Sequence, residues 1–170
     1  MRIETKPARE MSDSEKARTE CVVTSSLYSF LLGTKWADAD WTVMVWEDDD
    51  LVSNVHIINR TAIVGGQEVR LGGLGNVATK AEWRKRGYAS AALKVAREFL
   101  YDPLKVDFGL MIATEQMIPR YIKTGWQLVA DSMWIEQPEG RKLFTTPVIV
   151  LPVKRKTWPQ GEIDLCGLPW

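Results

Sequence analysis

The sequence predicts one α/β (α+β) domain with a mixed, mostly antiparallel sheet of about six to seven strands and helices on both faces. Residues 71–79 (LGGLGNVAT) are small and apolar, which predicts a buried strand whose backbone something approaches closely. Residues 88–100 repeat apolar side chains at helical spacing. Residues 106–113 (VDFGLMIA) predict a second buried strand. A strand–helix–strand unit of this length requires a right-handed crossover, so we expect the two strands to be parallel.

The N-terminal part predicts an edge strand and a helical region. Residues 2–6 can form a short edge strand that Pro7 ends. Ser12 and Glu15 have the spacing of a capping box, which predicts a helix start. The helical pattern continues to about Leu32, with a break near residues 24–26.

A meander of antiparallel strands is expected between this region and the central strand. Residues 42–47 and 51–58 predict two strands joined by the acidic turn 47–50, which we interpret as a solvated hairpin tip and not as a metal site. Gly65 and Gly66 predict a second tip, between residues 61–64 and 67–71.

The C-terminal third predicts a short helix and further strands. Residues 119–124 form the helix, with Pro119 in its first turn, and a strand begins at Trp126. Residues 132–137 and 147–152 predict the last two strands, with a loop between them. We treat residues 1–170 as a single domain in which 154–170 is a tail that packs on the body, because it carries Ile, Leu and Trp.

Composition excludes several classes of function. Lys and Arg total 22, as do Asp and Glu, so the net charge is zero, which argues against nucleic acid or a membrane surface as the main partner. The sequence lacks an apolar run of about 18 residues and an N-terminal signal core, which predicts a cytoplasmic protein. Cys21 and Cys166 are expected to be free thiols, and no metal-ligand spacing is present.

A candidate anion site follows the central strand. Arg84, Gly87 and Ala89 stand where a polar turn leads into the helix, whose first N–H groups and dipole favour an anion. Lys85 and Arg86 add positive charge, and Gly87 lets a diphosphate approach the backbone. The alternative is an ordinary strand-to-helix turn whose basic residues are solvated.

The spacing of Arg84, Gly87 and Ala89 resembles the acyl-CoA-binding motif of the GCN5-related N-acetyltransferase (GNAT) superfamily. The resemblance implies that the central strand and the next one splay apart and that pantetheine bonds to the central strand in the gap. It also implies acetyl-CoA as the acyl donor and no metal. The implied donor-binding residues are Val77, Ala78, Thr79, Arg84, Lys85, Arg86, Gly87, Tyr88 and Ala89.

Residues 121–126 (YIKTGW) match the Tyr-x-x-x-Gly-Phe/Trp signature of the same superfamily. There the tyrosine is the usual general acid, which protonates the departing CoA thiolate, and Tyr121 takes that role by resemblance. The alternative is a core tyrosine that packs its ring.

Within the superfamily, the chain is most similar to the aminoglycoside 2′-N-acetyltransferases. The likeness rests on residues 77–84, the Asp40–Trp41 pair, residues 121–126 and a final Trp170 after a cysteine-containing segment. It implies an acceptor that lies against acidic groups, including the C-terminal carboxylate. The chain departs from that family at acidic positions: Gly75 stands where those enzymes have a glutamate, Thr34 and Lys35 replace an acidic loop position, and Leu168 and Pro169 precede the final residue.

The loop of residues 34–41 is a candidate acceptor site, because Trp36, Asp38 and Trp41 combine aromatic and acidic groups that suit a cation. The alternative is a surface turn with solvated carboxylates. His56, the sole histidine, is either a general base or a structural residue.

These residues predict an N-acetyltransferase that moves an acetyl group directly from acetyl-CoA to a primary amine of a small, possibly aminoglycoside-like molecule. Asp40 and the Trp170 carboxylate are the candidate bases, acting through water, and Tyr121 is the acid. Nucleic acid and membrane are not expected partners, and a homodimer is an open alternative. Three other interpretations remain: a longer acyl donor accommodated at glycines 72, 73 and 75, a non-catalytic acyl-CoA-sensing domain, and an unrelated nucleotide binder.

Overall fold

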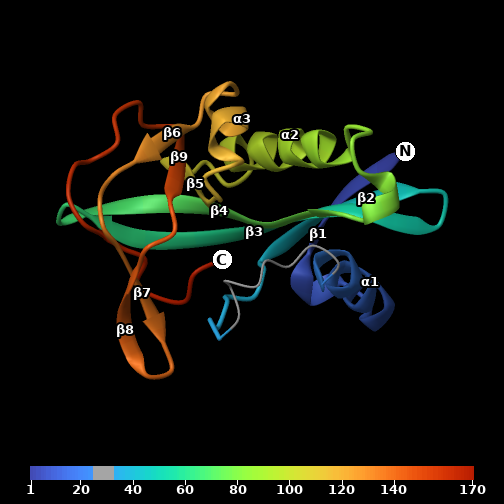
Figure 1. Ribbon diagram of the computed structural model, residues 1–170, viewed down its shortest axis with the longest axis horizontal. Coiled ribbons are helices and arrows are strands. Elements are labelled where there is room, and N and C mark those ends of the chain that lie inside the picture. The colour runs from blue at the N-terminus through green and yellow to red at the C-terminus, as the bar shows by residue number, and fades with distance from the viewer. Residues whose placement is uncertain (25–32) are drawn as a thin grey trace.

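The computed structural model describes residues 1–24 and 33–170, with only the backbone of Thr24, and the described part forms one mixed ten-stranded sheet with helices on both faces (Figure 1). The strands are β1 (Arg2–Pro7), β2 (Trp41–Glu47), β3 (Asp50–Val64), β4 (Gln67–Thr79), β5 (Phe108–Ile112), β6 (Gln127–Val129), β7 (Met133–Gln137), β8 (Gly140–Phe144), β9 (Val148–Pro152) and β10 (Ile163–Asp164). The α-helices of the described residues are α1 (Asp13–Thr24), α2 (Tyr88–Tyr101) and α3 (Ile118–Ile122).

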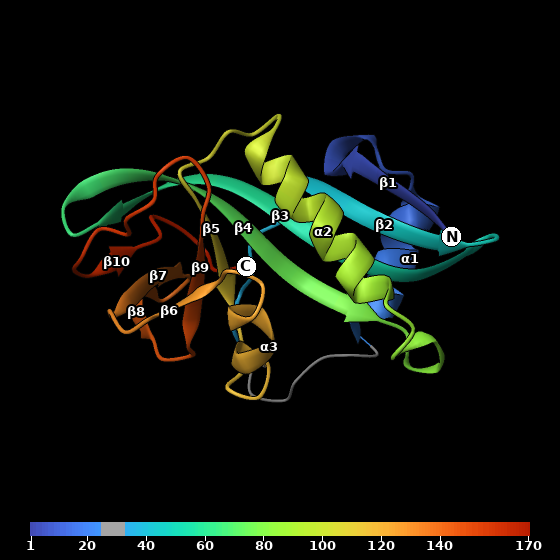
Figure 2. The same ribbon diagram turned by 90° about the horizontal axis from the view of Figure 1, so that it is seen from above.

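The sheet confirms the predicted fold class. Its strand order is β6-β9-β5-β4-β3-β10-β7-β8, with β2 on β3 and β1 on β2. Only β4–β5 and β7–β10 are parallel pairs among the described strands. Helix α2 crosses one face over β2, β3 and β4, whereas α1 lies on the opposite face (Figures 1 and 2). The crossover through α2 therefore produces the parallel pair expected from the sequence.

Strands β3 and β4 form the long hairpin at the centre of the sheet. Its tip is Gly65–Gly66, with φ values of 54° and 79°, as the pattern predicted. Strand β4 continues from this tip through the whole small-residue run to Thr79. A register shift between Asn54 and His56 places a bulge opposite them, and Asn76 there has φ 47°.

The parallel pairing of β4 with β5 is short. It joins Leu71 to Phe108, Gly72 to Gly109 and Gly73 to Leu110, and it ends there. Residues 74–79 of β4 have no partner in β5. The separation of the two strands that the resemblance implied is therefore present, and it begins at Gly73.

Two strands of the sheet, β8 and β10, were not predicted from the sequence. Strand β8 pairs with β7 where we predicted a loop, because four of its five residues are exposed and its pattern shows no apolar face. Strand β10 lies inside the tail and is only two residues long. These additions, with the short β6, raise the strand number above the expected six or seven.

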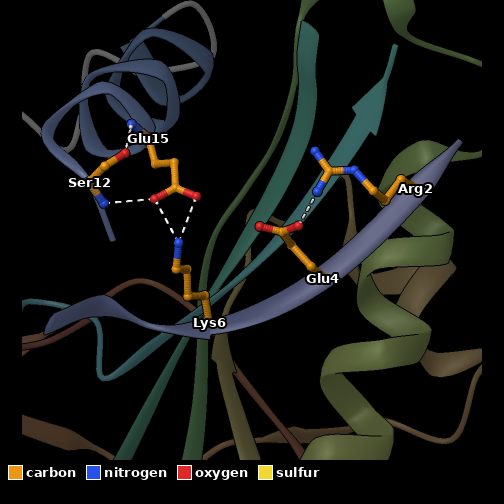
Figure 3. A network of polar contacts seen from close by, with 5 residues as sticks. All are labelled: Arg2, Glu4, Lys6, Ser12 and Glu15. Carbon is orange, nitrogen blue, oxygen red and sulfur yellow. Dashed lines mark hydrogen bonds and ion pairs between the residues drawn. The ribbon is translucent and has the colours of Figure 1, made fainter. Parts of the chain in front are cut away.

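The start of α1 follows the predicted capping box. The N–H of Glu15 donates to Oγ of Ser12 at 3.2 Å, and the N–H of Ser12 donates to the Glu15 carboxylate at 2.7 Å. The same carboxylate binds Nζ of Lys6 in β1, which ties the helix to the edge strand (Figure 3). The predicted break and the end of this helical region fall within residues 24–32, of which 25–32 lie outside the described residues.

Close approach at the glycines of β4 joins α2 and the tail to the sheet. A Cβ at Gly72 would lie 2.3 Å from Cδ2 of Leu100 in α2, so glycine lets the helix pack tightly there. On the opposite face, a Cβ at Gly73 would lie 2.1 Å from Cε2 of Trp170. The close approach that the small residues predicted is therefore made by Leu100 and Trp170.

The described helices include none that is both long and apolar enough to cross a membrane.

We predict that Gly73→Ala lowers the free energy of unfolding by about 1–3 kcal/mol, because the new methyl group would overlap the Trp170 indole. Urea denaturation measures this cost. In a Trp170→Ala background the same substitution should cost much less, because the overlapping ring is gone. An equal cost in both backgrounds would contradict the packing described here.

Candidate functional site

The N-terminus of α2 forms a cradle of exposed backbone N–H groups. Gly87 precedes the helix with φ 90°, and Lys85 also has a left-handed φ of 62°. The first helical hydrogen bond runs from Ala91 N–H to the Gly87 carbonyl, so the N–H groups before it have no acceptor within the helix. Apart from Gly87 and its two chain neighbours, no atom of the described residues lies within 4 Å of the position of a Cβ at Gly87. The cradle therefore has room for an anion against the backbone.

Neighbouring side chains hold this turn in shape. Nε of Arg84 donates to the carbonyl oxygen of Thr79 at 3.1 Å, and the guanidinium of Arg86 lies 5.0 Å from the centre of the Trp83 ring. The hydroxyl of Tyr88 donates to Glu47 at 2.9 Å. Desolvation, followed by the bond to Glu47, raises the pKa of Tyr88 above its usual value, so this phenol stays neutral at pH 7. Arg84 and Tyr88 thus brace the turn that Lys85 and Gly87 shape.

The open edge of β4 leads from this cradle towards the centre of the sheet. Ser53 in β3 donates its hydroxyl to the Ala78 carbonyl at 2.7 Å and lies 2.8 Å from the Thr79 hydroxyl. These bonds anchor the end of β4 on its β3 side. Val77, Ala78 and Thr79 lie in the part of β4 that β5 does not pair with. Their backbone can therefore bind a ligand that adds to the sheet as a strand does.

A pocket of about 400 Å³ lies between α2 and α3, and Tyr121 is part of its wall. Tyr121 is buried, with 8% exposure, and its ring lies 6.3 Å from that of Trp126. Sequence reasoning found these two residues but missed the rest of the wall, because isolated basic residues on a helix resemble a solvated face. The other lining residues are Ser90, Leu93, Lys94, Arg97, Glu98, Tyr101, Arg120 and Thr124.

The tail brings Trp170 to β4 on the face opposite α2. Its indole Nε1 donates to the Leu110 carbonyl at 3.2 Å, and the residue is 5% exposed. A Cβ at Gly75 would lie 2.9 Å from the main-chain carboxyl carbon of Trp170. The carboxyl group of Trp170 thus lies where a side chain at residue 75 would begin.

The remaining predicted acid, Asp40, has a partner of its own. Its Oδ2 accepts a hydrogen bond from the Asn59 N–H at 2.8 Å, and its backbone N–H donates to the Ile57 carbonyl at 2.9 Å. Asp40 is exposed at the start of β2. Its carboxylate therefore helps to hold the β2–β3 edge.

The predicted acceptor residues are not brought together. Trp36 packs edge-on against Phe144 of β8, with ring centres 6.2 Å apart. Trp41 packs against Phe99 of α2, at 5.5 Å, which is on the other face of the sheet. Asp38 is exposed in the loop between them. Of these three residues, Trp36 lies nearest to the tail by its contact, because its partner Phe144 packs against the hydrophobic cluster that contains Trp170.

His56 lies in β3 directly opposite Gly75. Its Nδ1 is 2.9 Å from Nδ2 of Asn76, whose own carbonyl accepts a bond from Nδ2 of Asn54 at 2.9 Å. Burial lowers the pKa of His56 to about 4, so the imidazole is neutral at pH 7. Because directly opposite residues of an antiparallel pair point to the same face, the neutral imidazole lies on the face of the sheet that Trp170 covers at Gly75.

No group of three or more His, Cys, Asp or Glu side chains able to hold a metal occurs in the described residues. Cys21 and Cys166 are both exposed free thiols.

Fold and site together define an α+β protein with a split parallel strand pair and a helix N-terminus at its open end. Escherichia coli ElaA has the same fold, with a TM-score of 0.64, 12% identity, and coverage of 89% of this chain and 99% of ElaA. An acyl-CoA N-acyltransferase from Pseudomonas aeruginosa superposes with a TM-score of 0.62 and 13% identity, over 89% of this chain and 98% of the other.

A GNAT-family acetyltransferase from Brucella melitensis, solved in complex with acetyl-CoA, gives a TM-score of 0.61 and 13% identity, over 95% of this chain and 94% of that one. The family model described as "Acetyltransferase (GNAT) domain" matches residues 31–129, more than half of the chain. The chain therefore belongs to the GNAT acetyltransferase family. No curated protein matches the sequence.

We predict that stability falls as the pH drops from about 6.5 towards 4, by roughly 1–3 kcal/mol, because the unfolded chain protonates His56 in this range and the native state does not. Above pH 6.5 both states hold a neutral imidazole and the contribution is fully present. Urea denaturation at a series of pH values measures the slope. His56→Gln should flatten it between pH 5 and 6.5, and an unchanged slope in that variant would refute the assignment.

We also predict that Gly87→Ala weakens acetyl-CoA binding by about tenfold, because the alanine methyl group enters the cradle and occupies the space that the diphosphate would take against the backbone. Isothermal titration calorimetry measures the affinity. Gly66→Ala is the matched control, since Gly66 has φ 79° and open space but lies at the β3–β4 tip. Equal affinities for the two variants would argue against a diphosphate at Gly87.

Proposed function

We propose that this protein is an acetyl-CoA-dependent N-acetyltransferase that acts on a primary amine of a small molecule by direct transfer. The observation that carries the proposal is the open edge of β4 between two groups with opposite roles. At one end is the cationic helix N-terminus at Gly87, and at the other is the carboxyl group of Trp170 against Gly75. A donor bound along this edge has its phosphates at the first group and its thioester near the second.

The donor side of the proposal uses backbone groups and a cationic turn. The N–H groups before Ala91 and the side chains of Lys85 and Arg86 receive the diphosphate. Pantetheine adds to β4 as an extra strand at residues 77–79. A β4 N–H among residues 74–77 then holds the thioester oxygen as it becomes an oxyanion.

Tyr121 is the proposed general acid. It lines the α2–α3 pocket and is buried in the hydrophobic cluster that includes Leu74 of β4, against which Val77 also packs. A phenol has a pKa close enough to that of a thiol to protonate the departing CoA thiolate. No other described tyrosine is buried in that wall, because Tyr101 is 47% exposed.

The Trp170 carboxylate is the proposed base, in preference to Asp40. An amine is protonated at neutral pH and must lose its proton before it attacks. Asp40 already accepts a bond from the backbone of Asn59, whereas the Trp170 carboxyl carbon lies directly over Gly75. It therefore supplies an acid group at the residue where the 2′-N-acetyltransferases that the sequence resembles carry a glutamate, and it takes the proton through water.

The acceptor is proposed to enter from the face that Trp36 and the β7–β8 hairpin border. An aminoglycoside is one amine to test, because the sequence resembles the 2′-N-acetyltransferases at the segments named above. Fewer carboxylates are available for several ammonium groups than in those enzymes. Arg60, which stands near Asp40 and Glu136, also offsets negative charge on this face.

We predict that Tyr121→Phe lowers kcat by about a hundredfold or more, since it removes the proton donor for the thiolate. The affinity for CoA should stay within about threefold, because the ring and its packing remain. Thiol release measured against a panel of amines, including aminoglycosides, gives kcat. Tyr101 lines the same pocket, so Tyr101→Phe is the matched control, and its turnover is expected to equal that of the parent.

The same measurements separate the competing functions. No thiol release from the parent protein with any amine, together with tight acetyl-CoA binding, would favour an acyl-CoA-sensing domain. Stronger thermal stabilisation by ATP or NAD than by acetyl-CoA would favour a nucleotide binder and refute the proposal.

A further inference from the structure

The space beside the glycines in the middle of β4 is occupied by other residues. Leu100 occupies the space at Gly72, and the Trp170 indole occupies the space at Gly73. At Gly75 the nearest atom belongs to the main chain of Trp170. The glycines therefore make room for Leu100 and Trp170. A longer acyl chain, which the sequence left open as an alternative at these glycines, would meet these two residues there.

The indole of Trp170 lies at the point where β4 and β5 separate. Pairing ends at Gly73 and Leu110. The ring lies on Gly73 of one strand and donates Nε1–H to the Leu110 carbonyl of the other, at 3.2 Å. It therefore contacts both strands where the gap between them closes.

The direction of the donor follows from the order of the sites along the chain. The proposed diphosphate site, residues 84–87, follows the end of β4 at Thr79 after the short turn of residues 80–83. An arm that runs from there along the open edge passes Thr79 first and Leu74 last, a path of roughly 17 Å at the rise of an extended strand. Its acyl end consequently points at the closed end of the gap, where Trp170 lies.

The ring is held from several sides. The guanidinium of Arg60 lies 5.2 Å from the ring centre, and its Nη1 donates to the carbonyl of Leu168. The Pro169 carbonyl accepts a hydrogen bond from the Ala37 N–H at 2.7 Å. A longer acyl chain would have to displace a side chain that the surrounding structure fixes in place.

We infer that the indole of Trp170 forms the inner wall of the acyl site and limits the donor to a short acyl group such as acetyl. This inference rests on the proposed function, because it requires an acyl-CoA along β4. It assigns the indole a role in donor choice that is separate from the carboxylate of the same residue.

The test compares the binding of acetyl-CoA, hexanoyl-CoA and free CoA by isothermal titration calorimetry, without an acceptor amine. The parent protein should bind acetyl-CoA at least about tenfold more tightly than hexanoyl-CoA, because a filled pocket strongly rejects added methylene groups. Trp170→Ala should bring the two affinities to within about threefold or reverse their order, because the closed end of the gap becomes open. Trp158→Ala is the matched control: it removes a tail tryptophan that packs on Phe108, and the parent preference should persist.

The outcomes distinguish this inference from the function on which it rests. If the parent binds hexanoyl-CoA as tightly as acetyl-CoA, or if Trp170→Ala keeps the parent preference, the inference is wrong and the acyltransferase proposal stands. If the parent binds neither acyl-CoA nor CoA, both are wrong. If Trp170→Ala does not fold, Trp170→Leu decides, since leucine keeps an apolar contact with Gly73 and is smaller than the indole.

Discussion

The short pairing of β4 with β5 is the constraint on which the rest of the site depends. Three residue pairs join the two strands, and the backbone of β4 beyond Gly73 has no partner in β5. Unpaired N–H and C=O groups in the middle of a sheet need a partner. The bulge at Asn76 turns this part of β4 without ending the strand. A strand-like ligand arm is the partner that fits this edge.

The two faces of the sheet carry different parts of the proposed site. Helix α2, whose N-terminus forms the anion cradle, packs on one face through Leu100 and its small neighbours. The tail approaches on the other face and brings Trp170 to Gly73 and Gly75. Leu100 and Trp170 thus lie against neighbouring glycines of β4 from opposite faces, and in the proposed arrangement a donor in the gap would contact both sides. The proposed acceptor would then meet the donor from the face of the tail.

The tail reaches β4 through hydrogen bonds with the backbone of other segments. Ile163 and Asp164 of β10 pair with β7 and β3, and the Gly167 carbonyl accepts a hydrogen bond from the Glu136 N–H at 2.9 Å. These bonds do not depend on which side chains the tail carries. Each one removes conformational freedom from the residues that precede Trp170, so the indole and carboxyl group arrive in a fixed position.

Local sequence patterns predicted the structure correctly wherever the residues that determine an element lie close together in the sequence. The capping box at Ser12, the glycine tip at Gly65 and the crossover from β4 through α2 were all predicted, because each depends on residues close in sequence. Strand β8 was missed because its exposed side chains lack an apolar face and only its pairing with β7 makes it a strand. The basic residues of the α2–α3 pocket were missed for a similar reason.

The sequence by itself determined the fold class, the parallel pair and the cradle at Gly87, since hydrophobic periodicity and glycine placement specify these locally. Only the tertiary structure decided what lies against the glycines of β4. Trp41, next to Asp40 in the sequence, went to the face of α2, because neighbouring residues of a strand point to opposite sides. Trp170, nearly a hundred residues from Gly73, came to lie against it, because backbone pairing of the tail brings distant segments together in a way that no local pattern records.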